Sequence, residues 1–221
     1  MHAPVKGVSQ KGQRREARAR ATRDRIVKAA RELFEKKGYS ATTVASIAAE
    51  AGVATATVYQ AFGTKYAILA RALDLAIVND QDPVGLLDRP WGDRVRDTAD
   101  PHDRLTLVVN HTSEIAARTA ALKRAMRDAA ATDPEVGVLI LEDHQRRLRT
   151  QRALVGFVLD AAPLRPGLTK DDAVATFFGT VNSDCYLLMA DNLGWDLDRW
   201  QRWLVQLLSH GLFGTTAGPV P

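Results

Sequence analysis

Apolar residues recur at steps of three and four along most of this chain of 221 residues, which is the spacing of amphipathic α-helices. A clear stripe runs from Ile26 to Phe34, and Lys36-Lys37-Gly38 then supplies cations at the negative end of the helix and a glycine stop. No segment has a convincing strand or hairpin pattern. The chain is therefore predicted to be all-α, with about nine to ten helices.

The segment 43–65 predicts two short helices joined by a tight turn at Gly52, since glycine adopts the left-handed backbone usual at a helix end. The first helix has one apolar face, made of Val44, Ile47, Ala48 and Ala51. The second keeps Val58 and Phe62 for the core. Its outward positions are Thr55, Ala56, Thr57, Tyr59 and Gln60. Such a helix has the size and chemistry to enter a DNA major groove.

Beyond residue 65 the helical pattern continues with one interruption. The Pro- and Gly-containing stretch 81–101 is interpreted as the boundary region between two domains. Further helices are expected at 65–80, 105–117, 120–131, 133–160, 169–192 and 196–212. Their start signals include a capping aspartate before Pro134 and a capping box formed by Thr169 and Asp172.

The predicted domains have different compositions. Residues 1–21 form a basic arm, expected to be disordered in its first half, and 22–66 form a three-helix helix-turn-helix domain. Residues 67–214 form a C-terminal ligand-binding and dimerisation domain, followed by a tail at 215–221.

Positive charge is concentrated at the N-terminus. Residues 1–65 carry 13 Lys and Arg against 5 Asp and Glu, whereas the whole chain carries 30 against 26. The remainder is therefore acidic, and the net charge of +4 hides a segment suited to a polyanion. DNA phosphate is favoured over a membrane surface, because the basic segment lacks the bulky apolar face of an interfacial helix.

Composition argues against several other classes of protein, namely disulfide-linked, secreted, membrane-spanning and metal-binding proteins. The single cysteine, Cys185, excludes an internal disulfide and fits a reducing cytoplasm. The N-terminus lacks the apolar stretch of a signal peptide, and polar residues 182–184 interrupt the longest apolar run, so no membrane span is expected. The five histidines show no pair at metal-ligand spacing, and nothing predicts a cofactor.

Residues 26–69 resemble the DNA-binding domain of the tetracycline-repressor (TetR) family of bacterial transcriptional regulators. The resemblance rests on Phe34, Gly38-Tyr39, Thr42-Thr43-Val44, Ile47-Ala48, Ala51-Gly52-Val53 and the run from Thr57 to Lys65. It implies a cytoplasmic homodimer that binds a palindromic operator, usually as a repressor, and releases it when a small-molecule effector enters the C-terminal domain.

The resemblance also implies roles for individual residues. Thr43, Tyr59 and Lys65 would contact phosphates, while Thr55, Thr57 and Gln60 would face the groove, where glutamine can pair with adenine. Ala54 departs from the serine common at the cap of the reading helix, so either that helix start is less well satisfied or Thr55 takes the capping role. Gln60 replaces a frequent histidine.

Two further sites are predicted in the C-terminal domain. The last two helices carry more apolar surface than a peripheral helix needs, which predicts a dimer interface at Phe177, Val181, Cys185, Leu188, Trp203, Leu204 and Leu207. The alternative is a central helix of a monomeric bundle. The effector is expected among Trp91, His111, Phe157, Phe178, Asn182 and Tyr186.

Other functional interpretations remain. Tyr59 is alternatively a core residue, and Lys65 is alternatively a plain helix-surface lysine. The arginines of the arm either reach a minor groove or flanking phosphates or form only a solvated arm; they are Arg14, Arg15, Arg18 and Arg20. A DNA-binding regulator without an effector is one alternative function. A helical enzyme that uses Cys185 with His111 or His144 is another, disfavoured because a cysteine on an apolar helix face is usually a packed hydrophobe.

Overall fold

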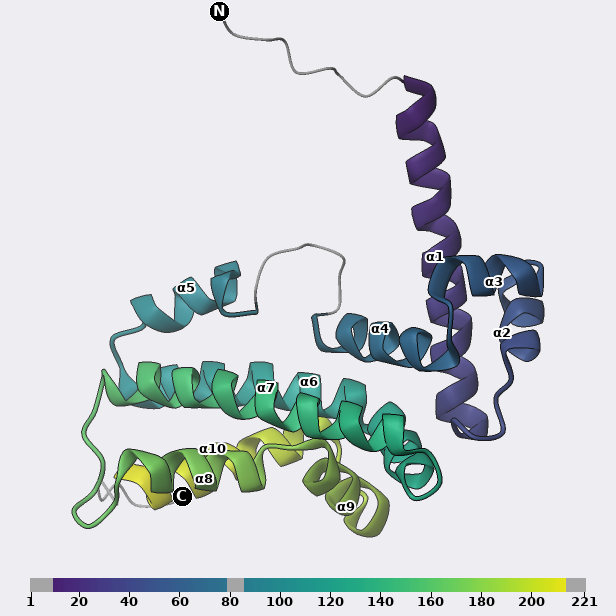
Figure 1. Ribbon diagram of the computed structural model, residues 1–221. Helices are drawn as coiled ribbons and strands as arrows, with labels where there is room; N and C mark the ends of the chain where they lie inside the picture. The colour runs from purple at the N-terminus through teal and green to yellow at the C-terminus, as the bar shows by residue number, and fades with distance from the viewer. Residues whose placement is uncertain (1–9, 79–85, 214–221) are drawn as a thin grey trace, which may run out of the picture. The chain divides into compact units, whose positions relative to one another are not determined.

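The computed structural model describes residues 10–78 and 86–213, and these residues form ten α-helices and one short 3-10 helix (Figure 1). The predicted all-α fold is confirmed. The chain divides into two compact units between Leu73 and Asp74. This division falls inside α4 (Lys65–Val78), so one continuous helix contributes to both units.

Unit 1 contains α1 (Gln10–Lys37), α2 (Val44–Ala51), α3 (Thr55–Phe62) and the first part of α4. Its core is formed by the predicted apolar stripes, and Ile26, Phe34, Ile47 and Leu69 are completely buried. Burial of these large side chains fixes the short helices, which would be marginal by themselves in water.

The first helix is longer than predicted. α1 begins at Gln10, so the second half of the predicted arm 1–21 is helical, and residues 1–9 lie outside the described part of the chain. Residues 13–21 are mostly alanine, arginine, glutamine and glutamate, which are strong helix formers. They therefore extend the helix that the packed part nucleates.

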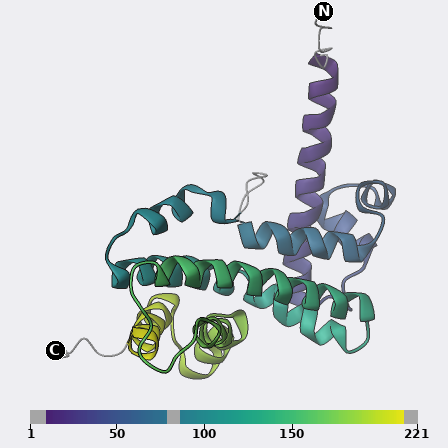
Figure 2. The ribbon, with the colours of Figure 1, turned by 60° about the vertical axis from the view of Figure 1, so that its left-hand side comes forward.

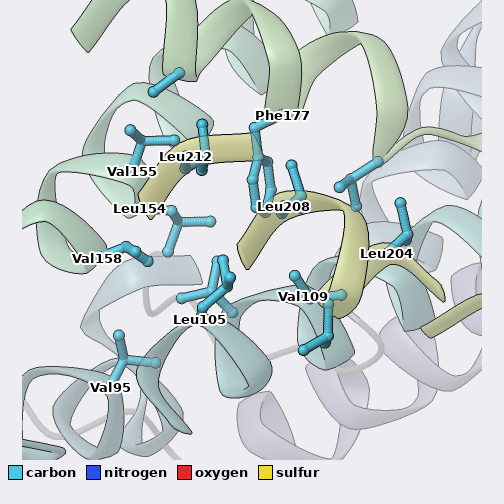
Figure 3. Packing of buried hydrophobic residues seen from close by; sticks show 14 of the residues in the cluster. Val95, Leu105, Val109, Leu154, Val155, Val158, Phe177, Leu204, Leu208 and Leu212 are labelled. Atoms are coloured by element: carbon cyan, nitrogen blue, oxygen red, sulfur yellow. The ribbon is translucent and has the colours of Figure 1, made fainter. Parts of the chain in front are cut away.

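Unit 2 contains the end of α4, η1 (Leu86–Asp88) and α5 to α10. These helices are α5 (Pro90–Asp97), α6 (Pro101–Ala130), α7 (Pro134–Leu159), α8 (Lys170–Thr180), α9 (Ser183–Leu193) and α10 (Leu197–Phe213). The long helices α6 and α7 lie side by side, with α8 to α10 against them (Figures 1 and 2). Leu105, Leu154, Phe177, Leu204 and Leu208 meet in the core between these helices (Figure 3).

The boundaries in unit 2 correct three predictions. The stretch 81–101 contains a packed helix, α5, whose Trp91 and Val95 are buried. The helices predicted at 105–117 and 120–131 are one continuous helix, α6, and the hydroxyl of Thr119 donates to the carbonyl of Ile115 within it. The helix predicted at 169–192 is instead two, α8 and α9, separated at Val181 and Asn182.

The capping predictions are confirmed. Asp133 caps α7 with Pro134 in the first turn, and Thr169 and Asp172 form the capping box of α8. Within the described ranges, each helix is too short or too polar to span a lipid bilayer.

Candidate nucleic-acid interface

The start of α2 is fixed by a loop with several hydrogen bonds. The backbone N–H of Ser46 donates to the Thr43 hydroxyl at 3.0 Å, and the N–H of Thr43 donates to the Ser46 hydroxyl at 3.1 Å. Thr42 is buried and donates its hydroxyl to the carbonyl of Gly38 at 2.8 Å. Thr43 is exposed, so its hydroxyl hydrogen is available to a phosphate while its oxygen caps the helix.

A left-handed glycine sets the angle between α2 and α3. Gly52 has φ 64° and ψ 42°, and the N–H of Val53 donates to the carbonyl of Ala48 at 3.0 Å. This arrangement satisfies the last carbonyls of α2, and a residue with a side chain would be strained there. The turn therefore holds α3 in a defined direction against α2.

Helix α3 has one buried and one outward face. Val58 is 1% exposed, whereas Tyr59 is 53% exposed. Thr55, Ala56 and Gln60 are exposed, as predicted, whereas Thr57 is half-buried. Tyr59 is therefore not a core residue. A surface of hydroxyl, amide and small apolar groups can donate to phosphates, read base edges and contact thymine methyl groups.

The start of α3 resolves one of the sequence alternatives. Ala54 is the N-cap, with φ −69° and ψ 146°, and the cap makes no side-chain hydrogen bond. Thr55 is the first residue inside the helix and has no capping role. Its hydroxyl is consequently available to DNA, but the first backbone N–H groups of α3 receive no hydrogen bond from a capping side chain.

Lys65 has structural partners that the sequence did not predict. Its ammonium donates to the carbonyls of Tyr39 and Thr42, each at 3.0 Å, and lies 4.0 Å from the centre of the Tyr39 ring. These contacts tie the start of α4 to the loop before α2. The predicted phosphate contact of Lys65 stays a prediction, and the lysine is in addition a positioning residue for Thr43.

The predicted effector residues occupy several places in unit 2. Trp91 on α5 and His111 on α6 stack, with ring centroids 3.8 Å apart. Phe157 lies under the guanidinium of Arg96, and Tyr186 lies beside Trp200. Phe178 packs against Arg147, while Asn182 caps α9. The structure thus joins Trp91 with His111 and does not unite all six residues by contacts.

The Trp91–His111 pair combines a histidine of lowered pKa with two buried ring nitrogens that have no hydrogen-bond partner among the described residues. Burial lowers the pKa of His111 from 6.5 to about 4, with further lowering by Arg118, Arg89 and Arg94. The imidazole is therefore neutral at physiological pH. Trp91 Nε1 and His111 Nε2 are buried and have no hydrogen-bond partner among the described residues. Buried polar atoms are usually bonded, so a bound molecule could supply the missing partners.

The predicted dimer residues fall into two groups. Phe177, Val181 and Leu204 are each at most 2% exposed and pack inside unit 2, so these three are unsuited to an interface. Leu188 is 57% exposed and Leu207 is 38% exposed, while Cys185 and Trp203 are partly buried. The sequence pattern did not separate the inner faces of these apolar helices from their outer faces. Leu193 on α9, which is 58% exposed, is a further exposed apolar residue.

The described residues contain no group of three or more His, Cys, Asp or Glu side chains placed to hold a metal ion. Cys185 donates its thiol hydrogen to the carbonyl of Gly179 at 3.3 Å, and Asn182 Nδ2 lies 3.5 Å from the sulfur. The thiol thus packs at the junction of α8 and α9.

The packed helices α1, α2 and α3, the glycine turn and the exposed outer face of α3 define a helix-turn-helix regulator that binds DNA. Residues 26–72 match the model of the family described as bacterial regulatory proteins, tetR family. Residues 26–72 therefore form a DNA-binding domain of this family, and the chain is a DNA-binding transcriptional regulator. No curated protein sequence matches it.

Several solved structures share the fold. FadR from Bacillus subtilis in complex with stearoyl-CoA is 22% identical, with a TM-score of 0.66, and the match covers 85% of this chain and 97% of FadR. A complex of SmeT with triclosan is also 22% identical, with a TM-score of 0.66 and coverage of 91% and 99%. NalD from Pseudomonas aeruginosa, the secondary repressor of the MexAB-OprM multidrug efflux pump, is 20% identical, with a TM-score of 0.65 and coverage of 89% and 98%.

Proposed function

We propose that the protein is a homodimeric repressor that binds a palindromic operator through α3 and leaves it when a small molecule binds unit 2. The observation that carries this proposal is the outer face of α3. Tyr59 and Gln60 are exposed on a helix anchored by Val58, where a hydroxyl and an amide can contact phosphates and base edges. Two copies of this helix in a two-fold dimer would read two half-sites.

Selection of DNA from a random-sequence library tests the proposal. Wild-type protein should enrich a two-fold symmetric motif, whereas Gln60→Ala should retain the motif with relaxed preference at one position in each half-site. Glu50→Ala is the matched control, because Glu50 is exposed on α2 but is not on the outer face of α3. An asymmetric motif, or loss of preference at every position with Gln60→Ala, would contradict the proposed mode of reading.

The stacked Trp91–His111 pair is the proposed effector site. It offers two flat aromatic faces, and the Trp91 N–H and the His111 Nε2 lack partners in the described residues. A molecule with an apolar body and a hydrogen-bonding group would match these features. Stearoyl-CoA and triclosan, which are bound in two of the similar structures, are suitable first probes.

Helix α4 is the proposed route from this site to DNA. Arg118 on α6 donates to the carbonyls of Ala76 and Ile77 at 2.7 and 3.0 Å, and Arg146 on α7 pairs with Asp74 at 2.9 Å. These contacts hold the end of α4 within unit 2, while its start belongs to unit 1. A ligand that moves α6 would therefore pull on α4.

A release assay tests this route. An effector should dissociate the wild-type protein from the selected operator, and Arg118→Lys should weaken release more than it weakens DNA binding. Arg124→Lys is the matched control on α6, since the ion pair of Arg124 within the described residues is an exposed contact with Asp191 at 3.2 Å. Equal release by both variants would exclude the proposed route. DNA binding that no small molecule affects would instead favour a regulator without an effector.

We also infer that the protein acts as a regulator without enzymatic chemistry of its own. Cys185 is the single cysteine of the chain, and its thiol donates a hydrogen bond to a backbone carbonyl at the junction of two helices. Cys185→Ala should therefore leave operator binding and release unchanged.

A further inference from the structure

The first turns of α1 form a basic extension, defined here as residues 13–25. Residues 13–21 are all exposed, and the packed part of α1 begins at Ile26, which is completely buried. At 1.5 Å per residue the extension is about 20 Å long. Within unit 1 it continues beyond α2 and α3 (Figures 1 and 2). Packing inside unit 1 does not explain this length of helix.

The charges of the extension are arranged by face. It carries six arginines against Glu16 and Asp24. With about 100° between successive residues, Arg14, Arg18 and Arg25 lie within about 40° of one another. Glu16 lies on the opposite side of the helix, and Asp24 lies about 100° from the stripe. Arg14, Arg18 and Arg25 therefore form a basic stripe without an acidic neighbour on their own face.

The stripe differs from the rest of α1. Further along the helix, Lys28 pairs with Glu32 at 4.0 Å and Arg31 pairs with Glu35 at 2.6 Å. Among the described residues, no acidic side chain forms an ion pair with Arg14, Arg18 or Arg25. A row of unpaired guanidinium groups on a rigid helix suits a polyanion with regularly spaced charges.

We propose that the stripe binds the phosphate backbone of the DNA that flanks the bases read by α3. This inference rests on the proposed function, because it requires α3 to place unit 1 on DNA. A helix with its side chains is about 10–12 Å wide, whereas the minor groove is about 6 Å wide, so the extension lies along the backbone and not within that groove. Its apolar side chains are alanines, which cannot form the apolar face of a helix bound to a membrane.

Two double variants test the stripe. Arg14→Gln/Arg18→Gln removes two charges from it, and Arg20→Gln/Arg23→Gln removes the same charge from the side of the helix that carries Glu16. Glutamine is a good helix former, and circular dichroism would verify that both variants retain the helix. Fluorescence anisotropy would measure binding of the full chain to a duplex selected by the wild-type protein, with flanks of roughly two helical turns, over a series of salt concentrations.

The stripe variant should lose affinity and its salt slope should fall by about two for each subunit, since each phosphate contact contributes about 0.9. The control variant should change the slope by less than half as much. A duplex without flanks should abolish the difference between the two variants. Because Gln60→Ala alters base preference and the stripe variant should not, the two proposals have separate readouts.

Three results would overturn the inference. Equal losses for both double variants would show that only net charge matters, although α3 would still read DNA. A difference between the variants on phosphatidylserine vesicles but not on DNA would assign the stripe to membranes. Failure of the wild-type protein to retain any duplex would overturn both this inference and the proposed function.

Discussion

At the scale of single residues, Lys65 shows how a predicted DNA contact can also hold the domain together. Its ammonium group donates to the carbonyls of Tyr39 and Thr42 and lies over the face of the Tyr39 ring. Removal of the side chain takes the Lys65 donor away from both carbonyls, although the carbonyl of Tyr39 keeps the backbone N–H of Thr42 at 3.1 Å. A charged hydrogen bond of this kind contributes about 1.5–3 kcal/mol.

Lys65→Ala should therefore lower the free energy of unfolding of the protein by about 2 kcal/mol, in addition to any loss of DNA affinity. Lys28→Ala is the control, because that lysine has an 80% exposed side chain and a 4.0 Å ion pair worth at most about 1 kcal/mol. Urea unfolding of both variants would measure the difference. Equal unfolding midpoints for the two would show that the carbonyl contacts of Lys65 contribute little.

His111 makes the stability of unit 2 depend on pH. Its pKa is about 4 in the folded protein, chiefly because of burial, and 6.5 without that environment. Between these values the unfolded chain binds a proton that the folded chain does not. Stability therefore falls as the pH drops from 6.5 towards 4, and it is fully retained above pH 6.5.

His111→Gln should flatten this dependence. One proton accounts for at most about 1.4 kcal/mol per pH unit, and solvent access to the partly buried ring reduces that figure. Denaturant unfolding of the wild-type protein and His111→Gln at a series of pH values would measure both slopes. Parallel pH profiles would show that the histidine takes up its proton as readily in the folded state as in the unfolded state.

At the scale of elements, the junction of α8 and α9 depends on side chains distant in sequence. Arg147 on α7 donates to the carbonyls of Phe178 and Val181 at 3.2 and 3.3 Å, and its guanidinium lies 3.7 Å from the centre of the Phe178 ring. Gln151 donates to the same carbonyl of Val181 at 3.3 Å. These donors satisfy backbone groups that a continuous helix would have satisfied by itself.

Arg147→Lys should consequently destabilise the protein by about 2 kcal/mol, because lysine keeps the charge but loses the planar fork and the stacking on Phe178. Arg149→Lys, at an exposed position of the same helix, should change stability by less than about 0.5 kcal/mol. Calorimetric or urea unfolding would compare them. An equal effect of the two substitutions would mean that the junction is held by its local caps alone.

This junction also shows where prediction from sequence ends. The reading helix was predicted because its determinants are local: Gly52, Val58 and the spacing around them lie within one short segment. The break at Asn182 was not predicted, because polar residues 182–184 were used only as evidence against a membrane span, although Asn182 is the N-cap of α9. The donors that Arg147 supplies to this break lie on another helix and are not visible in the local sequence. The structural contacts of Lys65 were similarly not predicted, since its partner Tyr39 lies 26 residues away. The extent of α1 was underestimated because its apolar stripe begins only at Ile26, and the basic, alanine-rich residues before it have no such stripe.

At the scale of the whole molecule, exposed apolar side chains predict the surface that pairs two copies. Leu188 and Leu193 on α9 and Leu207 on α10 are exposed, while Phe177 and Leu204 are enclosed by their own unit. Exposed apolar side chains that gather on one surface usually mark an interaction surface, and α9 and α10 contact each other. The outer faces of α9 and α10 are therefore the proposed dimer interface, and their inner faces belong to the subunit core.

The double variant Leu188→Glu/Leu207→Glu should sediment as a monomer, because it places two charges on each side of a surface that the dimer would bury. The control is Val138→Glu/Leu141→Glu on α7, where the side chains are 51% and 62% exposed. It should sediment like the wild-type protein. A monomeric control together with an intact α9–α10 variant would move the interface to α7.

The Leu188→Glu/Leu207→Glu variant also tests whether dimer assembly is needed for DNA binding. A dimer binds two half-sites at once, so its second contact is intramolecular, and a monomer forfeits that gain in avidity. The α9–α10 variant should therefore bind a symmetric operator at least about 100-fold more weakly than the wild-type protein, yet bind an isolated half-site equally well. Anisotropy titrations with both duplexes would separate these effects. Weaker binding to the half-site as well would indicate damage to unit 1, whereas unchanged binding to the symmetric operator would show that the reading helices act without pairing through α9 and α10.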